Sequence, residues 1–174
     1  MRSTGSAFYN FFIRGTANEP GPILLHPLSR GTVTIDTADP YFALPKVDYR
    51  ALSNPVDGDL VVEFTRFTRR VFSQTSLTAF NPVELLPGAN VTIKEDIIAE
   101  IRGRLVPTSF HPVGTAAMMP RNLGGVVDEE LRVYGVKGLS VVDASVMPDL
   151  PGAYTQGTVY AVAEKAADLI KGRG

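Results

Sequence analysis

The stretch "TQGTVYAVAEKAADLIKG" (155–172) carries the clearest helical pattern in the chain. Lys171 lies in its last turn and Gly172 follows, which is typical of a helix end. The apolar residues recur at the spacing of one helical face, namely at Val159, Val162 or Ala163, Ala166 and Ile170. The pattern predicts an amphipathic helix that needs a layer of protein to cover its apolar face.

The segment just before this helix, "GLSVVDAS" (138–145), holds a short apolar run between Gly and Ser. Such a run predicts a buried strand. Because the run is apolar on both faces, we expect the strand to be sandwiched inside a larger domain.

Two more helices are predicted upstream. "GDLVVEFTRFTRRVFSQ" (58–74) has apolar residues at helical spacing, with the predicted buried stripe at Leu60, Phe64, Phe67 and Val71. In "TIKEDIIAEIRGR" (92–104), Thr92 and Glu95 fit the pattern of a capping box. The predicted buried stripe of that helix consists of Ile97, Ile98 and Ile101.

The first half of the chain also contains strand patterns. "ILLHPLSRGTVTID" (23–36) predicts a turn and then a strand, in which Val33 and Ile35 alternate with polar residues. "TADPYFALPKVDY" (37–49) contains two prolines and predicts an extended loop with a short edge strand. Strands and helices follow one another without a regular βαβ alternation, so the predicted fold class is α+β.

Composition narrows the function classes. The chain has 174 residues, 44% of them hydrophobic, and a net charge of −1, which suits a domain or slightly more with a packed core. No dense Lys/Arg block is present, so we expect no nucleic-acid partner. No apolar run is long enough for a membrane span, and the N-terminus does not read as a signal peptide. The localisation therefore stays open.

Residue types also limit the chemistry. The absence of cysteine excludes disulfides, thiolate metal sites and cysteine nucleophiles. The two histidines, His26 and His111, have no accompanying cluster of ligands, so we expect no metal site. His26 stands in "LLHPLSRG" beside a turn proline, where a structural role is expected.

The stretch "FHPVGTAAMMP" (110–120) is the strongest candidate for catalysis. A histidine side chain has an ordinary pKa of about 6.5, so His111 can be neutral and accept a proton at working pH. Pro112 and Gly114 would fix the backbone around it, and Phe110 would supply an apolar wall for an aromatic or allylic substrate. Taken alone, a histidine such as His111 is more often a buried, hydrogen-bonded residue that has no catalytic role.

Several motifs in this order resemble the C-terminal portion of the glucose-methanol-choline (GMC) oxidoreductases, above all the fungal aryl-alcohol-oxidase and glucose-oxidase branch. The set is "HPVGTAAM", "GVVD", "YGVKGLSVVDASVMP" and "TQGTVYAVAEKAADLI". The resemblance extends back to "HPLSRGTVTI", which looks like the first strand of that family's substrate-binding domain. It covers roughly residues 20–172.

The resemblance implies a division of the chain. Residues 1–22 would form a loop extension, and 23–137 a substrate-binding part with a mixed or antiparallel sheet and flanking helices. Residues 138–174 would supply the strand, loop and helix that complete an FAD-binding domain.

The resemblance also implies a reaction. In this family a flavin takes hydride from an alcohol carbon while a base takes the hydroxyl proton, and His111 matches that base. Asp143 and Ala144 would face the cofactor. Backbone N–H groups near Thr155 and Gln156 would lie beside the flavin's pyrimidine edge, where an electropositive helix N-terminus favours the anionic reduced flavin.

The chain departs from the family at two points. Tyr154 occupies the position where the family usually has a second His or an Asn, and a phenol is a hydrogen-bond donor but a poor base at neutral pH. No G-x-G-x-x-G motif occurs, so the family's N-terminal dinucleotide-binding unit is expected to be absent. The chain alone is therefore expected to bind FAD weakly or not at all.

Three alternative functions are compatible with the sequence. The first is the C-terminal portion of an FAD-dependent oxidoreductase acting on the CH–OH group of a small alcohol, with aromatic alcohols among the candidates. The second is a flavin-independent isomerase, cyclase or dehydratase that uses His111 and Tyr154. The third is a non-catalytic remnant. We also expect an N-terminal FAD-domain partner or self-association through residues 138–172, because apolar surface there would otherwise be exposed.

Overall fold

The computed structural model describes residues 5–6, 9–10, 23–105 and 110–173. In this part of the chain, five short strands form two small antiparallel sheets, one with the order β1-β4-β5 and one that pairs β2 with β3. In the first sheet Val33 pairs with Val47. The bounds are β1 Gly5–Ser6, β2 Tyr9–Asn10, β3 Ile23–Leu24, β4 Arg30–Thr34 and β5 Lys46–Asp48.

The strands predicted within 23–36 and 37–49 are present as β4 and the edge strand β5. Of the N-terminal extension that was expected to be a loop, only residues 5–6 and 9–10 are described, and both pairs lie in strands. The rest of that extension lies outside the described residues.

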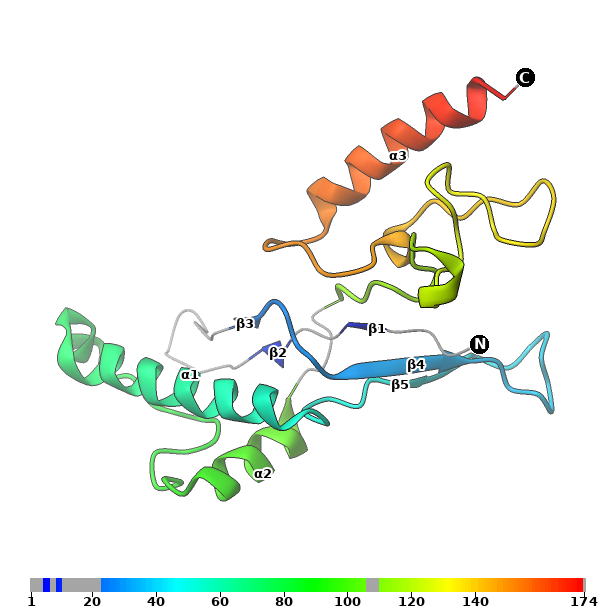
Figure 1. The fold of residues 1–174 in the computed structure, drawn as a ribbon. Coiled ribbons are helices and arrows are strands. Elements are labelled where there is room, and N and C mark those ends of the chain that lie inside the picture. Colours follow the sequence, from blue (N-terminus) through cyan, green and yellow to red (C-terminus); the bar gives the residue numbers. More distant parts are fainter. Residues whose placement is uncertain (1–4, 7–8, 11–22, 106–109, 174) are drawn as a thin grey trace.

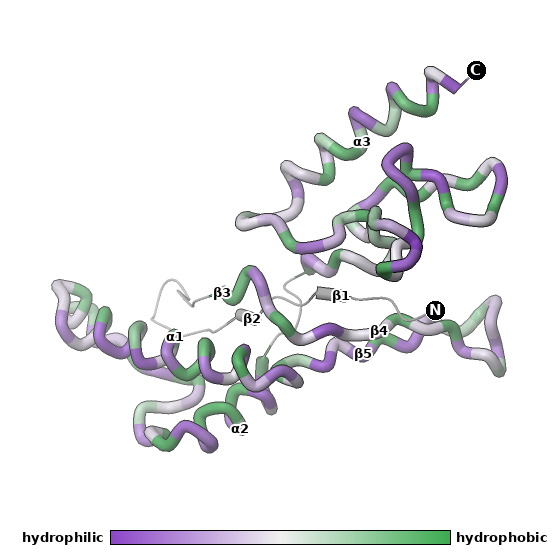
Figure 2. The backbone as a smooth tube through the Cα atoms, viewed as in Figure 1, coloured by the Kyte–Doolittle hydropathy of each residue, from purple (hydrophilic) through white to green (hydrophobic). Residues whose placement is uncertain are grey.

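Three α-helices accompany the strands: α1 Pro55–Gln74, α2 Lys94–Arg104 and α3 Gln156–Lys171. Short 3₁₀ turns span Ser76–Phe80, Arg121–Leu123 and Ala144–Val146. Figure 1 shows α1 and α2 on one side of the strands and α3 on the other, with the loops between α2 and α3 in the middle. Figure 2 shows hydrophobic residues recurring at intervals along α1 and α3, as expected for helices that bury one face.

Helix α1 begins after Asn54, whose side chain accepts a hydrogen bond from the Val56 N–H, and Pro55 occupies its first position. Its buried face differs from the predicted stripe. The buried positions are Asp57, Gly58, Val61, Val62, Thr65 and Thr68.

The predicted stripe of α1 was therefore wrong at Leu60, which is exposed, and at Phe67, which is 58% exposed, whereas Phe64 is partly buried and packs against the core. The smaller side chains of the neighbouring face admit a close approach of α2. A Cβ atom on Gly58 would lie 3.1 Å from Cδ1 of Ile98. The missing side chain at Gly58 thus leaves room for the Ile98 side chain at this interface.

Helix α2 confirms its predicted stripe, because Ile97 and Ile101 are fully buried and Ile98 packs against the same core. The predicted capping box is absent. The helix begins after Ile93 without a side-chain hydrogen bond to its first turn. Glu95 and Asp96 in that turn favour the helix through its dipole instead.

Helix α3 confirms the predicted helix, with Gly172 as its C-cap and Ala166 buried against Val127, Leu131 and Val146. Ile170, which was predicted to be buried, is exposed. None of the helices in the described ranges is both long enough and apolar enough to cross a membrane.

The strand predicted within 138–145 was wrong. The segment makes one isolated bridge, between Ser140 and Arg132, and then turns into the 3₁₀ helix Ala144–Val146. An apolar run becomes a strand only beside a neighbour that completes its hydrogen-bond ladder, and the described residues place no such strand there. The described chain thus has three α-helices and two small antiparallel sheets, in keeping with the α+β expectation.

Candidate active site

The segment that carries His111 is fixed to the turn before α3. The Ala116 N–H donates to the Ser145 carbonyl at 2.9 Å, and the Met118 N–H donates to the Val146 carbonyl at 2.8 Å. Beneath this pairing Val113 is buried in a small core with Met147 and Leu150, against which Val159 and Val162 of α3 pack. These contacts bring His111 to the beginning of α3.

At that point His111 meets two consecutive residues. Nδ1 of His111 lies 2.7 Å from Oγ1 of Thr155, which is 6% exposed. The rings of His111 and Tyr154 have centroids 4.9 Å apart and are tilted by 49°. The structure therefore brings together the two predicted catalytic residues and one predicted cofactor-binding residue.

The backbone around His111 is unusual. Gly114 has φ of 83°, a value that glycine adopts readily and other residues rarely do. Phe110, directly before His111, also has a positive φ of 63° and its side chain is 90% exposed. The special conformation expected from the Pro-Val-Gly sequence is present, whereas Phe110 packs against little of the described chain.

The predicted flavin-facing residues Asp143 and Ala144 line a cavity of about 350 Å³. Pro112 and Thr115 lie on the same wall, and the opposite wall comes from β4 and β5. The Asp143 carboxylate also accepts a hydrogen bond from the Ser145 N–H at 2.7 Å and so caps the 3₁₀ turn. Asp143 thus has a local structural role in addition to its position at the cavity.

The first turn of α3 carries no side-chain cap. Thr155, the N-cap residue, makes no side-chain hydrogen bond to the first turn, and the first turn contains no acidic residue. Gln156 is the first residue of the helix and is exposed. N–H groups of a first turn without a cap can bind an acceptor from outside the helix.

His26 lies outside this group. A Cβ atom on Gly152 would be 3.8 Å from Nε2 of His26, so the imidazole borders the loop that leads into Tyr154. The turn after His26 is held by the buried carboxylate of Asp57, which accepts hydrogen bonds from the Leu28 N–H and from both the N–H and the hydroxyl of Ser29. Among the described residues no group of three or more His, Asp or Glu side chains is placed to bind a metal.

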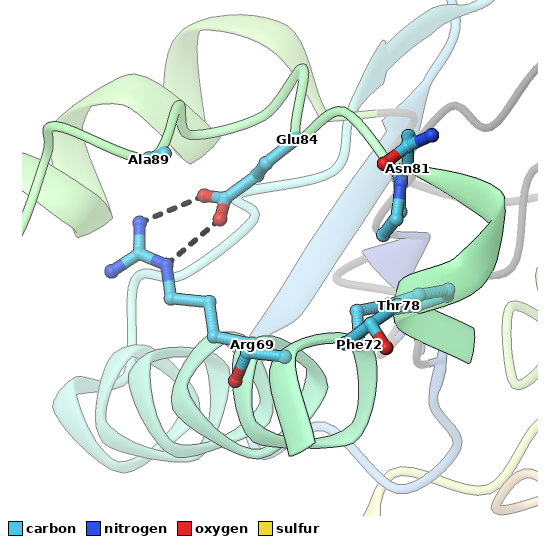
Figure 3. A pocket seen from close by; sticks show the side chains of 8 residues that line it. Arg69, Phe72, Thr78, Asn81, Glu84 and Ala89 are labelled. Carbon is cyan, nitrogen blue, oxygen red and sulfur yellow. Dashed lines mark hydrogen bonds and ion pairs between the residues drawn. The ribbon is translucent and has the colours of Figure 1, made fainter. Parts of the chain in front are cut away.

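A second cavity of about 510 Å³ lies near the C-terminal end of α1 (Figure 3). Arg69 faces Glu84 there, with Nε–Oε2 and Nη2–Oε1 distances of 2.9 and 2.7 Å. Nη2 of Arg69 also donates to the carbonyls of Gly88 and Val91. The hydrogen bond to Glu84 raises the pKa of Arg69 above its ordinary value, although partial burial acts in the opposite direction. The guanidinium is thus engaged in holding the 84–91 loop to α1.

Sequence reasoning missed the side-chain role of Thr155. The resemblance assigned it a backbone contact with a cofactor, whereas its hydroxyl contacts His111. The two residues are far apart in the sequence, and no local pattern links a helix-initiating threonine to a distant histidine. Only the packing of the 110–120 segment beside α3 brings them together.

Comparisons with known proteins show the family of the chain. The sequence profile of the GMC oxidoreductases matches residues 27–163. The dehydrogenase xptC of Emericella nidulans is 43% identical over 146 residues, which are 84% of this chain and 23% of that protein. The chain therefore spans about a quarter of the length of this curated relative.

Solved structures are similar as well. A fungal aryl-alcohol oxidase is 46% identical, with a TM-score of 0.78, over 86% of this chain and 24% of that one. An FAD-dependent oxidoreductase from Chaetomium thermophilum is 41% identical, with a TM-score of 0.79, over 87% of this chain and 26% of that one. On the profile match and these similarities, the chain belongs to the GMC oxidoreductase family and corresponds to its C-terminal portion.

Proposed function

We propose that the chain is the part of an FAD-dependent alcohol oxidoreductase that supplies the catalytic base, His111. The observation that carries this proposal is the contact of the His111 imidazole with Thr155 and Tyr154 at the beginning of α3. A base has to be held in one orientation beside the site where the substrate binds. The similarity to an aryl-alcohol oxidase supports an alcohol as the substrate, with aromatic alcohols as the first class to test.

The residues present fit a flavin. Asp143 and Ala144 line a cavity within the size range of small-molecule sites, and the start of α3 offers N–H groups to an anionic group. In the proposal, Asp143 and Ala144 contact the flavin and the backbone at Thr155 and Gln156 lies beside its pyrimidine edge. Bound flavin supplies the oxidant, since it accepts a hydride from the alcohol carbon.

The remaining steps use groups of this chain. Nε2 of His111 takes the proton of the substrate hydroxyl, so the alcohol loses a hydride and a proton and becomes a carbonyl compound. The Tyr154 hydroxyl donates a hydrogen bond to the substrate oxygen and holds it in place. Phe110 provides an apolar surface beside the substrate.

The test uses a chimera in which this chain replaces the matching quarter of the aryl-alcohol oxidase. We expect the chimera to be yellow and its flavin absorbance to bleach when an aromatic alcohol is added without oxygen. The isolated chain, titrated with FAD under the same conditions, is expected to bind weakly or not at all. A folded, flavin-loaded chimera that no alcohol reduces would contradict the proposed function.

A further inference from the structure

We propose that Asn90 accepts an N-linked oligosaccharide when the chain enters the endoplasmic reticulum. Asn90, Val91 and Thr92 form the sequence Asn-X-Thr, which is the acceptor motif for this modification when X is not proline. No other asparagine of the sequence has a Ser or Thr two positions later. The proposed site lies outside the oxidoreductase machinery and does not depend on the role proposed for His111.

The first support is the exposure of the motif. A glycan is bulky and hydrophilic, so a glycosylated asparagine has to lie on the surface of the folded protein. Asn90 and Thr92 are both exposed, whereas Val91 between them is partly buried and packs against the core that contains Ile97 and Ile101. Val91 thus anchors the segment, and the two residues that the modifying enzyme reads lie on the outside.

The backbone presents Asn90 at the tip of a turn. The Val91 N–H donates to the Gly88 carbonyl at 2.9 Å, which closes a four-residue turn with Ala89 and Asn90 in its two central positions. Gly88 has φ of 106°, a value that glycine adopts readily. A group attached to Asn90 therefore extends away from the segments on both sides of the turn.

The turn is also fixed to the rest of the molecule. Nη2 of Arg69 donates to the Gly88 carbonyl at 3.0 Å and to the Val91 carbonyl at 2.9 Å. Ala89 lines the cavity of about 510 Å³ beside the guanidinium of Arg69 (Figure 3). The turn thus holds its shape, and there is room beside Asn90 for the first sugar.

The Thr92 hydroxyl is available for recognition. Only Ser and Thr are accepted at the third position of the motif, and both carry a hydroxyl that can donate and accept hydrogen bonds. Helix α2 begins after Ile93, and no side chain caps its first turn. The hydroxyl is therefore not taken up by the capping role that the sequence predicted for Thr92.

The proposed site lies away from the candidate active site. Asn90 belongs to the loop that leads into α2, and Figure 1 shows α2 on the opposite side of the strands from α3. His111 and Tyr154 meet at the beginning of α3. A glycan on Asn90 would hydrate the side formed by α1 and α2 and leave the candidate active site uncovered.

The group transfer has defined reactants. The donor is an oligosaccharide whose first sugar is linked to a lipid diphosphate. The amide nitrogen of Asn90 forms a bond to C1 of that sugar, the bond between C1 and the diphosphate oxygen breaks, and the amide loses one proton. The products are the glycosylated chain and the lipid diphosphate, and no group is oxidised or reduced.

The experiment translates the 174-residue chain behind a cleavable secretion leader in the presence of endoplasmic-reticulum microsomes. Chains inside the microsomes are identified by their protection from added protease, so only translocated chains are scored. We expect the translocated wild-type chain to show a single step to lower electrophoretic mobility, which the amidase PNGase F reverses. Mass spectrometry of the treated peptide is expected to find an aspartate in place of Asn90.

Variants assign the step to the motif. Asn90→Gln removes the acceptor and Thr92→Ala removes the hydroxyl, so each is expected to abolish the mobility step. Thr92→Ser keeps the hydroxyl and is expected to retain it. Asn81→Gln, at an exposed asparagine of the same loop that lacks the motif, is the matched control and is expected to be modified like the wild type.

Three results would overturn the proposal. The first is a translocated wild-type chain without a glycan, and the second is a glycan that persists in Asn90→Gln. The third concerns the exposed turn, because we expect endoglycosidase H to release the glycan from the folded chain without denaturant, and release only after unfolding would contradict the exposure of Asn90. None of these readouts involves flavin or an alcohol, so failure here is distinguishable from failure of the proposed function.

Discussion

At the scale of single residues, His111 is the group whose loss should matter most to the reaction. In the flavin-loaded chimera, His111→Ala is expected to lower turnover of an aromatic alcohol by about 100-fold or more, the scale of a lost general base. His26→Ala is the matched control, because it removes the other histidine of the chain. Turnover is measured by stopped-flow reduction of the flavin, and equal rates for the His111→Ala variant and the wild type would refute the assignment.

Tyr154 tests the role of a hydroxyl at the same site. Tyr154→Phe keeps the ring that lies against His111 and removes only the donor, so we expect turnover to fall roughly threefold to tenfold. If Tyr154 stands where the family usually has a His or an Asn, as the sequence resemblance implies, Tyr154→His is expected to raise alcohol oxidation.

The control for Tyr154 is Tyr160→Phe. Tyr160 is 65% exposed, much like Tyr154 at 62%, but it lies further along α3. If Tyr154→Phe behaved like this control and Tyr154→His had no effect, Tyr154 would be only part of the wall of the site.

The residues of the site differ in how far the sequence reveals them. His111 stands out because histidine is rare in the chain and because the flanking Pro-Val-Gly requires a special backbone, which Gly114 adopts. Its contact with Thr155 is invisible in the sequence because it depends on a fold that places two distant segments side by side. The sequence thus reveals the chemistry of single residues, whereas contacts between distant residues are seen only in the folded structure.

At the scale of elements, α1 carries apolar residues at helical spacing on two of its faces, so the sequence pattern alone does not identify the buried face. Val61 is fully buried, whereas Phe67, on the stripe predicted from the sequence, is 58% exposed. We therefore expect Val61→Ala to lower the free energy of unfolding by about 2 kcal/mol through loss of buried contacts. Phe67→Ala is expected to change it by no more than about 0.5 kcal/mol.

Urea unfolding of the two variants followed by circular dichroism measures both values. The stripe predicted from the sequence requires the opposite order, because a large aromatic residue would then be in the core. A greater loss of stability for Phe67→Ala than for Val61→Ala would show that the larger residues of α1 form its packed face.

The elements themselves were predictable to different degrees. Helices α2 and α3 were predictable because some of their apolar residues recur at helical spacing and each helix satisfies its own backbone hydrogen bonds. The segment 138–145 was mistaken for a strand because a strand requires a hydrogen-bonded neighbour. The apolar sequence of the segment does not show whether such a neighbour is present. Local signals thus predict helices more securely than strands.

At the scale of the whole molecule, the exposed apolar side chains of the C-terminal part are the main feature. Leu139, Tyr160 and Ile170 are all exposed, and they lie within the 138–172 segment. Exposed apolar residues that gather on one surface promote association. We therefore expect the isolated chain to self-associate, with a mass that falls on dilution when measured by light scattering.

A charge placed on this surface should weaken the association. Tyr160→Lys is expected to shift the chain toward the monomer, and Ala161→Lys, which also adds one positive charge at an exposed position but about 100° around the same helix, serves as the control. A stable monomer at high concentration, with strong protection of the amides in 138–172 from hydrogen exchange, would contradict this prediction.

The His111–Thr155 contact has a consequence for recombination between related genes. Both partners lie within the C-terminal 64 residues, counted from His111 to Gly174. A crossover before position 111 or after position 155 transfers the histidine and its hydroxyl partner together. A crossover between them joins the histidine of one parent to the helix start of another, and the progeny inherit a compatible pair only where both parents carry matching side chains at these two positions.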